Sequence, residues 1–201
     1  MLFIDTSSLI EWGGLLIIAC FVFAETGLLL GLVVPGGETL LFTAGLLASS
    51  NSLKTSVVTL LLTMIIAGIA GDISGFYIGR KFKERLYKKK DTWYFKQKYL
   101  RMAEDFVSKH KKASLILGKF LPVIRPFSPV ITGTTRLNFS VFFPLTVCAA
   151  VLYMSVFILG GYFLGSRFPQ LENYLGWILP ISILVALIPV IIQIRKRAGN
   201  Y

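Results

Sequence analysis

Apolar residues are gathered in long runs along this chain of 201 residues. Three of these runs, residues 57–78, 139–164 and 174–194, are 21 to 26 residues long, which is enough for an α-helix to cross a bilayer. A shorter apolar run covers residues 9–24. The pattern predicts an all-α integral membrane protein with several full transmembrane helices.

Two further apolar runs, residues 28–48 and 113–132, are interrupted in the middle by residues that end helices. At about 1.5 Å of rise per residue, each arm of the first run reaches only halfway across a bilayer. Non-helical backbone at that depth is tolerated only where it is buried in protein or lines a wet cavity. Both runs therefore predict re-entrant helical hairpins, with a kinked single span as the alternative. The interruptions are formed by Pro35, Gly36 and Gly37 in the first run and by Pro122 and Pro126 in the second.

The basic residues are unevenly distributed along the chain. Residues 80–112 hold 13 of the 21 lysines and arginines against four acidic residues, and residues 195–197 hold three more. By the positive-inside rule, both basic segments are expected on the cytoplasmic side. An even number of crossings must then separate them, and the runs 139–164 and 174–194 already supply two. Residues 113–132 must therefore enter and leave the membrane on one side, as a hairpin does.

The composition excludes an ordinary soluble domain. Hydrophobic residues make up 55% and charged residues 15% of the chain, and the mean hydropathy is +0.71, whereas soluble domains carry about 25% charged residues. The net charge of +11 would suggest a nucleic-acid partner in a soluble protein. Most of it lies in residues 80–112, where Met102, Ala103 and Phe106 recur at helical spacing between lysines and arginines. This pattern predicts an amphipathic helix against the anionic inner leaflet, so no nucleic acid is expected as a partner.

The two halves of the chain resemble each other. Each half contains, in order, an apolar helix, an interrupted hairpin with a charge three residues after its proline, and a span that ends in glycine. Because one hairpin would enter the membrane from outside and the other from inside, the halves would form an inverted repeat. Many secondary transporters build their substrate site from such repeats. The corresponding positions are Pro35 and Pro122, Glu38 and Arg125, Gly45 and Gly133, and Gly79 and Gly165.

We expect residues 1–201 to form a single membrane domain. The first 12 residues contain two acidic residues and no lysine or arginine, so a cleavable signal peptide is not expected. The parts of the domain are a first half-repeat at about residues 9–80, a cytoplasmic basic amphipathic segment at about 81–112, a second half-repeat at about 113–166 and an extra C-terminal transmembrane helix at about 174–194.

Charged residues inside the apolar runs are the main candidates for function. Placing an ionised side chain at the bilayer centre costs about 2.5–3.5 kcal/mol of free energy even on a lenient scale, so the five candidate residues are expected to form ion pairs or to contact water. The opposite signs on the two hairpins suggest ion pairs that either staple the hairpins together or serve transport. Lysine and arginine can bind a lipid phosphate, and acids can accept protons or pair with the bases. The bases are Lys119 and Arg125, and the acids are Glu25, Glu38 and Asp72.

Short motifs around these charges are specific when taken together. They are Glu25-x-Gly27, Pro35-Gly36-Gly37-Glu38 with Ala44-Gly45, Gly71-Asp72 with Tyr77-x-Gly79-Arg80, and Gly118-Lys119-Phe120-x-Pro122-x-x-Arg125 before Gly133. With these motifs the chain resembles the DedA family, also called the SNARE-associated or VTT-domain family of membrane proteins. The resemblance covers about residues 21–165, which is most of the chain.

The resemblance implies a re-entrant-hairpin fold and the movement of lipids across a bilayer. Bacterial members of the family are linked to undecaprenyl phosphate recycling and phospholipid translocation. This sequence departs from the family pattern at three places. Lys119 stands where an arginine is usual, which keeps the charge and loses bidentate phosphate geometry. An extra glycine precedes Glu38, and Tyr153 stands where a tryptophan is usual.

The expected function is that of a membrane lipid translocase. It would move a phosphate-bearing lipid, such as undecaprenyl phosphate or a phospholipid, across the cytoplasmic inner membrane, with proton coupling left open. A proton-coupled small-ion or drug exporter is the alternative, because it would use the same buried charges. The sequence has no Cys–His pair, HExxH motif or Asp-rich motif, so we expect neither an intramembrane lipid enzyme nor a metal or other cofactor. The oligomeric state, including a homo-oligomer, is left open.

Overall fold

The computed structural model describes residues 6–27, 37–50, 55–88, 97–110, 113–121, 124–135, 137–168 and 170. These residues form seven α-helices and a short 3₁₀ helix, with no strand among them, which confirms the all-α class. The interruptions expected at Pro35, Gly36 and Pro122 and the helix expected at 174–194 lie outside the described residues. In chain order the elements are α1 (Thr6–Gly27), α2 (Gly37–Ser49), α3 (Val57–Lys88), α4 (Gln97–His110), α5 (Ala113–Leu117), η2 (Gly118–Phe120), α6 (Phe127–Thr134) and α7 (Phe139–Arg167).

Among the described helices, α3 and α7 are long and apolar enough to cross a membrane. In α3 this holds for Val57–Glu84, and in α7 it holds for the whole length of 29 residues. Both helices present large apolar side chains outward, such as Ile66 at 67% and Phe163 at 65% exposure. Exposed apolar surface on this scale marks a protein that contacts lipid or another apolar partner. The helical backbone of α3 bends at Phe82, just after its sequence turns from apolar to basic.

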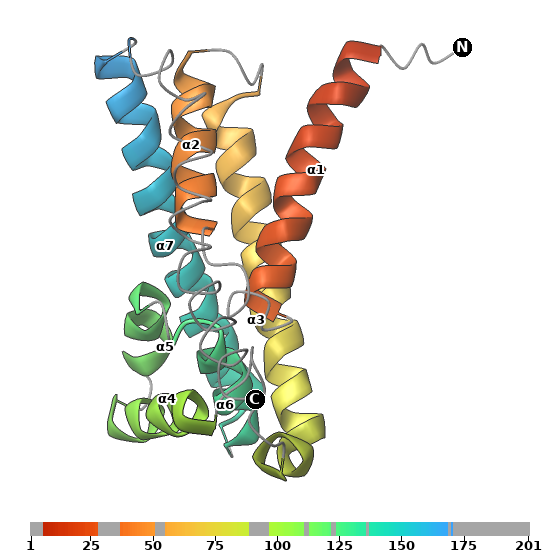
Figure 1. The fold of residues 1–201 in the computed structure, drawn as a ribbon, viewed down its shortest axis with the longest axis vertical. Coiled ribbons are helices and arrows are strands. Elements are labelled where there is room, and N and C mark those ends of the chain that lie inside the picture. Colours follow the sequence, from red (N-terminus) through yellow and green to blue (C-terminus); the bar gives the residue numbers. More distant parts are fainter. Residues whose placement is uncertain are drawn as a thin grey trace, which may run out of the picture.

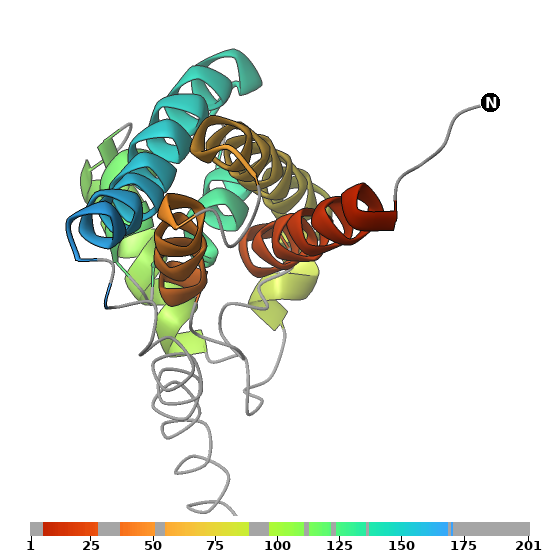
Figure 2. The ribbon, with the colours of Figure 1, turned by 90° about the horizontal axis from the view of Figure 1, so that it is seen from above.

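The helices are arranged along one long axis (Figure 1). The long helices α3 and α7 follow this axis, and α1 packs mainly on α3 at the edge of the bundle (Figures 1 and 2). Helix α2 lies in one half of the molecule, beside α7, whereas α5 and α6 lie in the other half. Helix α4 runs crosswise at that second end (Figure 1). The two short helices that follow the sequence interruptions, α2 and α6, thus lie toward opposite ends of the molecule.

Glycines allow two pairs of helices to pack backbone against backbone. A Cβ at these glycines would overlap a carbonyl group of the facing helix, and small residues permit such close approach between helices. In each pair, the glycine of one helix faces the carbonyl three residues before the glycine of the other. The contacts are Gly45 with Ile158 and Gly161 with Phe42 between α2 and α7, and Gly79 with Val130 and Gly133 with Phe76 between α3 and α6.

Helix α4 is amphipathic, as the sequence predicts, and its apolar face contacts protein. Its basic residues Lys98 and Arg101 are exposed on the other side. The apolar face covers the turn that leads into α6, so the basic segment lies directly against the second half of the molecule. The buried residues of this contact are Leu100, Ala103 and Val107 of α4 with Ile124, Phe127 and Ile131 of the turn and of α6.

Candidate functional site

Five charged side chains from five parts of the chain gather inside the bundle. Lys119 in η2 and Arg125 in the turn before α6 are 6% and 5% exposed, and Glu25 in α1 and Asp72 in α3 are 6% and 3% exposed. Glu38, in the first turn of α2, is less buried, because its side chain is 34% exposed. These are the five charged residues that the sequence singles out. We call them the charge cluster.

Arg125 contacts two acids of the charge cluster, Glu38 and Glu25. Its Nη1 donates a hydrogen bond of 2.6 Å to Oε1 of Glu38, and the same nitrogen lies 3.4 Å from Oε1 of Glu25. Nη2 of Arg125 has no hydrogen-bond partner among the described residues. The backbone N–H of Arg125 donates to the carbonyl of Leu121 at 2.8 Å. This tight turn positions the side chain immediately before α6 begins.

Gly37 and Pro126 both lie at the start of a helix beside the charge cluster, and each position suits its residue type. Gly37 is the first residue of α2, and a Cβ at this position would overlap the carboxylate of Glu25. Any side chain there would therefore displace Glu25 from Arg125. Pro126 is the N-cap residue of α6. A helix needs no N–H at its start, so the proline begins a helix here without the loss of a hydrogen bond.

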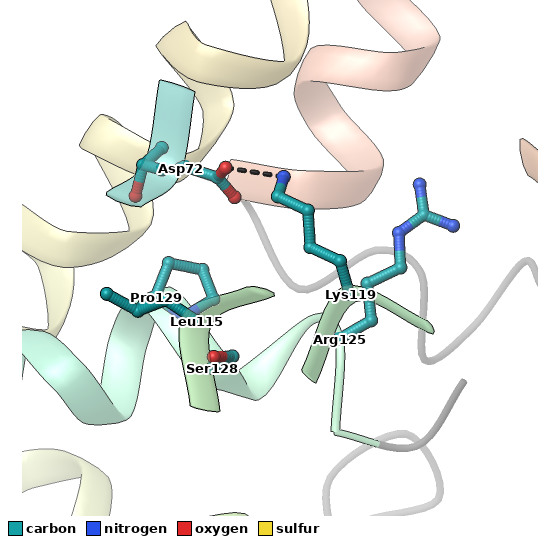
Figure 3. Close-up of a pocket in the computed structure, with 7 residues that line it drawn as sticks. Asp72, Leu115, Lys119, Arg125, Ser128 and Pro129 are labelled. Atoms are coloured by element: carbon teal, nitrogen blue, oxygen red, sulfur yellow. Dashed lines mark ion pairs between the residues drawn. The ribbon is translucent and has the colours of Figure 1, made fainter. Parts of the chain in front are cut away.

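Lys119 pairs with Asp72 of α3. Nζ of Lys119 lies 2.5 Å from Oδ2 of Asp72. In Figure 3 the guanidinium of Arg125 lies on the side of Lys119 that faces away from Asp72. The sequence suggested ion pairs between the two hairpins. That description fits Arg125 with Glu38, whereas the partner of Lys119 is Asp72 of the long helix α3.

A small cavity lies beside this ion pair and is lined by both bases (Figure 3). Its volume is about 10 Å³, roughly the room that one water molecule needs. Oγ of Ser128, a residue that is 2% exposed, has no hydrogen-bond partner among the described residues. The cavity therefore offers polar groups to a small polar species. Its lining residues are Asp72, Leu115, Lys119, Arg125, Ser128, Pro129 and Thr146.

Tyr153 of α7 is a further residue of the site, and the sequence did not predict it as a site residue. The residue is 1% exposed, and its hydroxyl donates a hydrogen bond of 2.9 Å to Oε1 of Glu38. The Cζ of Arg125 lies 4.5 Å from the centre of the Tyr153 ring, within the range of a cation–π contact. A buried tyrosine hydroxyl usually has a hydrogen-bond partner. A tyrosine in the middle of an apolar span is therefore a signal that could have indicated this role.

The charge cluster contains three acids and two bases, so its net charge is −1 when all five groups are ionised. One proton on any of the acids makes the cluster neutral. An anion that enters it needs either further protons or the displacement of an acid from a base. Of the described residues, no three His, Cys, Asp or Glu side chains lie close enough together to hold a metal ion.

A bundle of apolar helices around buried ion pairs defines a helical membrane protein. A family model described as the VTT domain matches residues 34–163, a range that includes four of the five residues of the charge cluster. The chain belongs to this VTT-domain family, which is also the DedA family. The family and the membrane character that the sequence predicts are thereby confirmed.

Similar proteins cover most of the chain. Protein DedA of Escherichia coli (strain K12) is 34% identical over 185 residues, which are 91% of this chain and 84% of that protein. An uncharacterized membrane protein of Mycobacterium tuberculosis is 35% identical over 183 residues, 91% of this chain and 78% of that one. Undecaprenyl phosphate transporter A of Bacillus subtilis is 28% identical over 181 residues, 87% of this chain and 90% of that one. No solved structure matches the chain.

Proposed function

We propose that this protein is a lipid translocase that moves a phosphate-bearing lipid, such as undecaprenyl phosphate or a phospholipid, across the cytoplasmic membrane. The arrangement around Arg125 carries the proposal. The guanidinium is buried, and its Nη2 has no hydrogen-bond partner among the described residues. A second base, Lys119, lines the same cavity. Neighbouring cationic N–H donors suit a phosphate, because charge-assisted hydrogen bonds are the strong ones.

The lipid nature of the cargo is supported by the family. One relative is named undecaprenyl phosphate transporter A, and none of the three relatives described above is named as an enzyme. A lipid tail can stay in the bilayer while the headgroup passes through the protein, so a small chain needs to enclose only the headgroup. Burial of an unpaired ion in an apolar medium is very costly. Lys119 and Arg125 would offset much of that cost for an ionised phosphate.

We also propose that the two halves form an inverted repeat with opposed re-entrant hairpins at residues 28–48 and 113–132. Two observations support this arrangement. Helices α2 and α6 lie toward opposite ends of the molecule (Figure 1). The glycine contacts of α2 with α7 have the same spacing as those of α6 with α3, so each short helix packs on the long helix of the other half. The single domain would comprise half-repeats at about 9–80 and 113–166, the basic segment at about 81–112 and a C-terminal helix at about 174–194.

Protons are the proposed coupling ion. The charge cluster has one acid more than it has bases, so protonation of Glu25, Glu38 or Asp72 changes its charge balance. An acid that accepts a proton no longer competes for Lys119 or Arg125. The freed base can then take the anionic headgroup, and loss of the proton would favour release.

Purified protein in liposomes tests the proposed function. A labelled phospholipid and a labelled undecaprenyl phosphate are each placed in one leaflet, and the rate at which label reaches the other leaflet is measured with and without a pH gradient. We expect both the protein and the gradient to accelerate at least one of the two lipids. The small size of the cavity, about 10 Å³, favours a small-ion exporter as the second candidate. If neither lipid moves faster than in protein-free liposomes while a small ion is carried, the exporter function is correct.

A further inference from the structure

Glu38 differs from the rest of the charge cluster in its exposure. Its side chain is 34% exposed, whereas those of Glu25 and Arg125 are 7% and 5% exposed. Two donors nevertheless bind its carboxylate. Nη1 of Arg125 at 2.6 Å and the hydroxyl of Tyr153 at 2.9 Å both donate to Oε1. The Glu38 carboxylate is thus well bound and also accessible from the surface of the bundle.

Glu38 leaves one donor of the Arg125 guanidinium unused. In a bidentate pair, a guanidinium engages two oxygens through two of its nitrogens. Here Glu38 accepts from Arg125 at Oε1 through Nη1, and Nη2 has no hydrogen-bond partner within the described part of the chain. A buried charged donor without an acceptor is costly. Oε2 of Glu25, the other acid beside Arg125, is also buried without a partner among the described residues. The unused Nη2 suits an anion that can accept from it while also accepting from Nη1.

We infer that Arg125 and Tyr153 form a binding site for a phosphate group and that the Glu38 carboxylate is its built-in occupant, which the phosphate displaces. The inference rests on the proposed function only in taking this phosphate to be a lipid headgroup. One phosphate oxygen takes the position of Oε1 between Nη1 and the Tyr153 hydroxyl, and a second oxygen accepts from Nη2. The Tyr153 ring, 4.5 Å from Cζ of Arg125, supports the guanidinium from one side.

The two glutamates have different roles in this exchange. Glu25 is buried, and its carboxylate lies against the backbone of Gly37, so it stays with Arg125 and orients the guanidinium. Glu38 has the freedom to leave, because a third of its side chain is exposed. When its carboxylate returns to Arg125 and Tyr153, it expels the phosphate. Competition by Glu38 thus weakens binding and makes release fast.

Binding of a short-chain phosphate lipid tests the exchange. Dioctanoyl phosphatidic acid is titrated calorimetrically into the purified full-length protein in detergent, with dioctanoylglycerol as the matched lipid without phosphate. We expect Glu38→Gln to tighten phosphatidic acid binding about tenfold, because a charged competitor is lost. We expect Tyr153→Phe to weaken it about tenfold, because one donor is lost. In liposomes, Glu38→Gln should bind lipid more tightly and yet translocate it more slowly.

Matched variants control for charge and for the hydroxyl group. Glu84→Gln removes an acid from an exposed position of α3, and Tyr162→Phe removes a hydroxyl from α7 away from Arg125; both should bind like the unmodified protein. Thermal unfolding in the same detergent verifies that each variant is folded.

Each outcome of these titrations bears on a different part of the inference. Inorganic phosphate is titrated in the same way as a second probe. If folded Glu38→Gln binds neither phosphatidic acid nor inorganic phosphate more tightly, the exchange is overturned. If it binds only inorganic phosphate more tightly, the exchange stands and the lipid is rejected. Unchanged binding by Tyr153→Phe would remove Tyr153 from the site. Opposite shifts in phosphatidic acid binding without any translocation would contradict the proposed function and leave the exchange standing.

Discussion

At the scale of single residues, Arg125 joins four parts of the chain. Its guanidinium contacts Glu25 of α1, Glu38 of α2 and the ring of Tyr153 in α7, and its backbone forms the turn before α6. A buried ion pair that loses one partner leaves an uncompensated charge, which typically costs about 3–5 kcal/mol. Changes at this residue are therefore expected to affect both stability and transport.

We predict that Arg125→Ala and Glu25→Ala each abolish lipid translocation and also lower stability, whereas Lys119→Arg is tolerated. The tolerated change keeps a positive charge that can pair with Asp72. Lipid movement in liposomes and thermal unfolding should be measured in parallel for each variant.

The double variant Glu25→Gln/Arg125→Gln separates the two effects. It removes Arg125 together with its buried partner Glu25 and leaves Glu38, whose side chain is 34% exposed to solvent. Its loss of stability should therefore be smaller than that of Arg125→Ala, because replacing both members of a buried pair is less costly than removing one. Translocation should still be absent. Normal translocation by a folded Arg125→Ala variant would contradict the role of Arg125 in phosphate binding.

The sequence identifies the members of the charge cluster better than their partners. Charges in apolar runs are costly, so all five are visible in the sequence. Partners depend on how helices pack, which is why the pairing of Lys119 with Asp72 and the contact of Gly37 with Glu25 are not readable from spacing. In the sequence, Tyr153 stands out only as a departure from the family pattern. Its role depends on the hydrogen bond from its hydroxyl to Glu38 of another helix, which spacing does not predict.

At the scale of helices, the two glycine-mediated pairs determine how closely the elements approach. A Cβ at Gly161 would overlap the carbonyl of Phe42, whereas a Cβ at its neighbour Gly160 would meet only the Phe42 ring, at 3.9 Å. The two glycines are adjacent on α7 and differ in what they face. They therefore provide a matched comparison of a close backbone contact and an ordinary one.

We predict that Gly161→Ala destabilises the protein by about 1–3 kcal/mol, the usual cost of overpacking, because α2 and α7 must move apart. Gly160→Ala should leave stability unchanged or raise it slightly, since alanine favours helix over glycine by up to about 1 kcal/mol. Chemical unfolding in detergent measures both changes. Equal stability of the two variants would show that α2 and α7 are not in direct backbone contact.

The elements are predicted well where length and apolar content decide them. The runs 57–78 and 139–164 correspond to α3 and α7, and residues 97–110 form the expected amphipathic helix. The sequence does not reveal what covers the apolar face of α4. An apolar helix face can be buried either at the boundary between headgroups and acyl chains or against protein. Only the packing of Leu100 and Val107 on α6 and its preceding turn distinguishes the two.

At the scale of the whole molecule, the two ends differ in charge. The basic helix α4 lies at one end, and the C-terminal end of α7 lies at the other (Figure 1). The positive-inside rule predicts that α4 lies on the cytoplasmic side. This prediction rests on the positions of lysines and arginines in the sequence.

We predict that Lys98→Cys is labelled from the cytoplasmic side and Arg167→Cys from the outside. Both positions are exposed. The native Cys20 and Cys148 are also exposed and should first be replaced by serine. A membrane-impermeant maleimide added to intact cells should then react with Arg167→Cys only. Reaction of Lys98→Cys in intact cells would reverse the topology and remove the parity argument for the second hairpin.

The exchange of short helices between the halves has a consequence for biosynthesis. Gly161 of α7, which packs against α2, lies 116 residues after Gly45 in the sequence, and Arg125 follows Glu38 by 87 residues. When the first half of the chain leaves the ribosome, Glu38 and the glycine face of α2 at Gly45 therefore do not yet have their partners from the second half. Contacts between distant parts of a chain form late, and the partly formed chain is prone to misassembly. We expect the first half to depend on the insertion machinery until α7 arrives, so that the protein matures in the membrane as one unit.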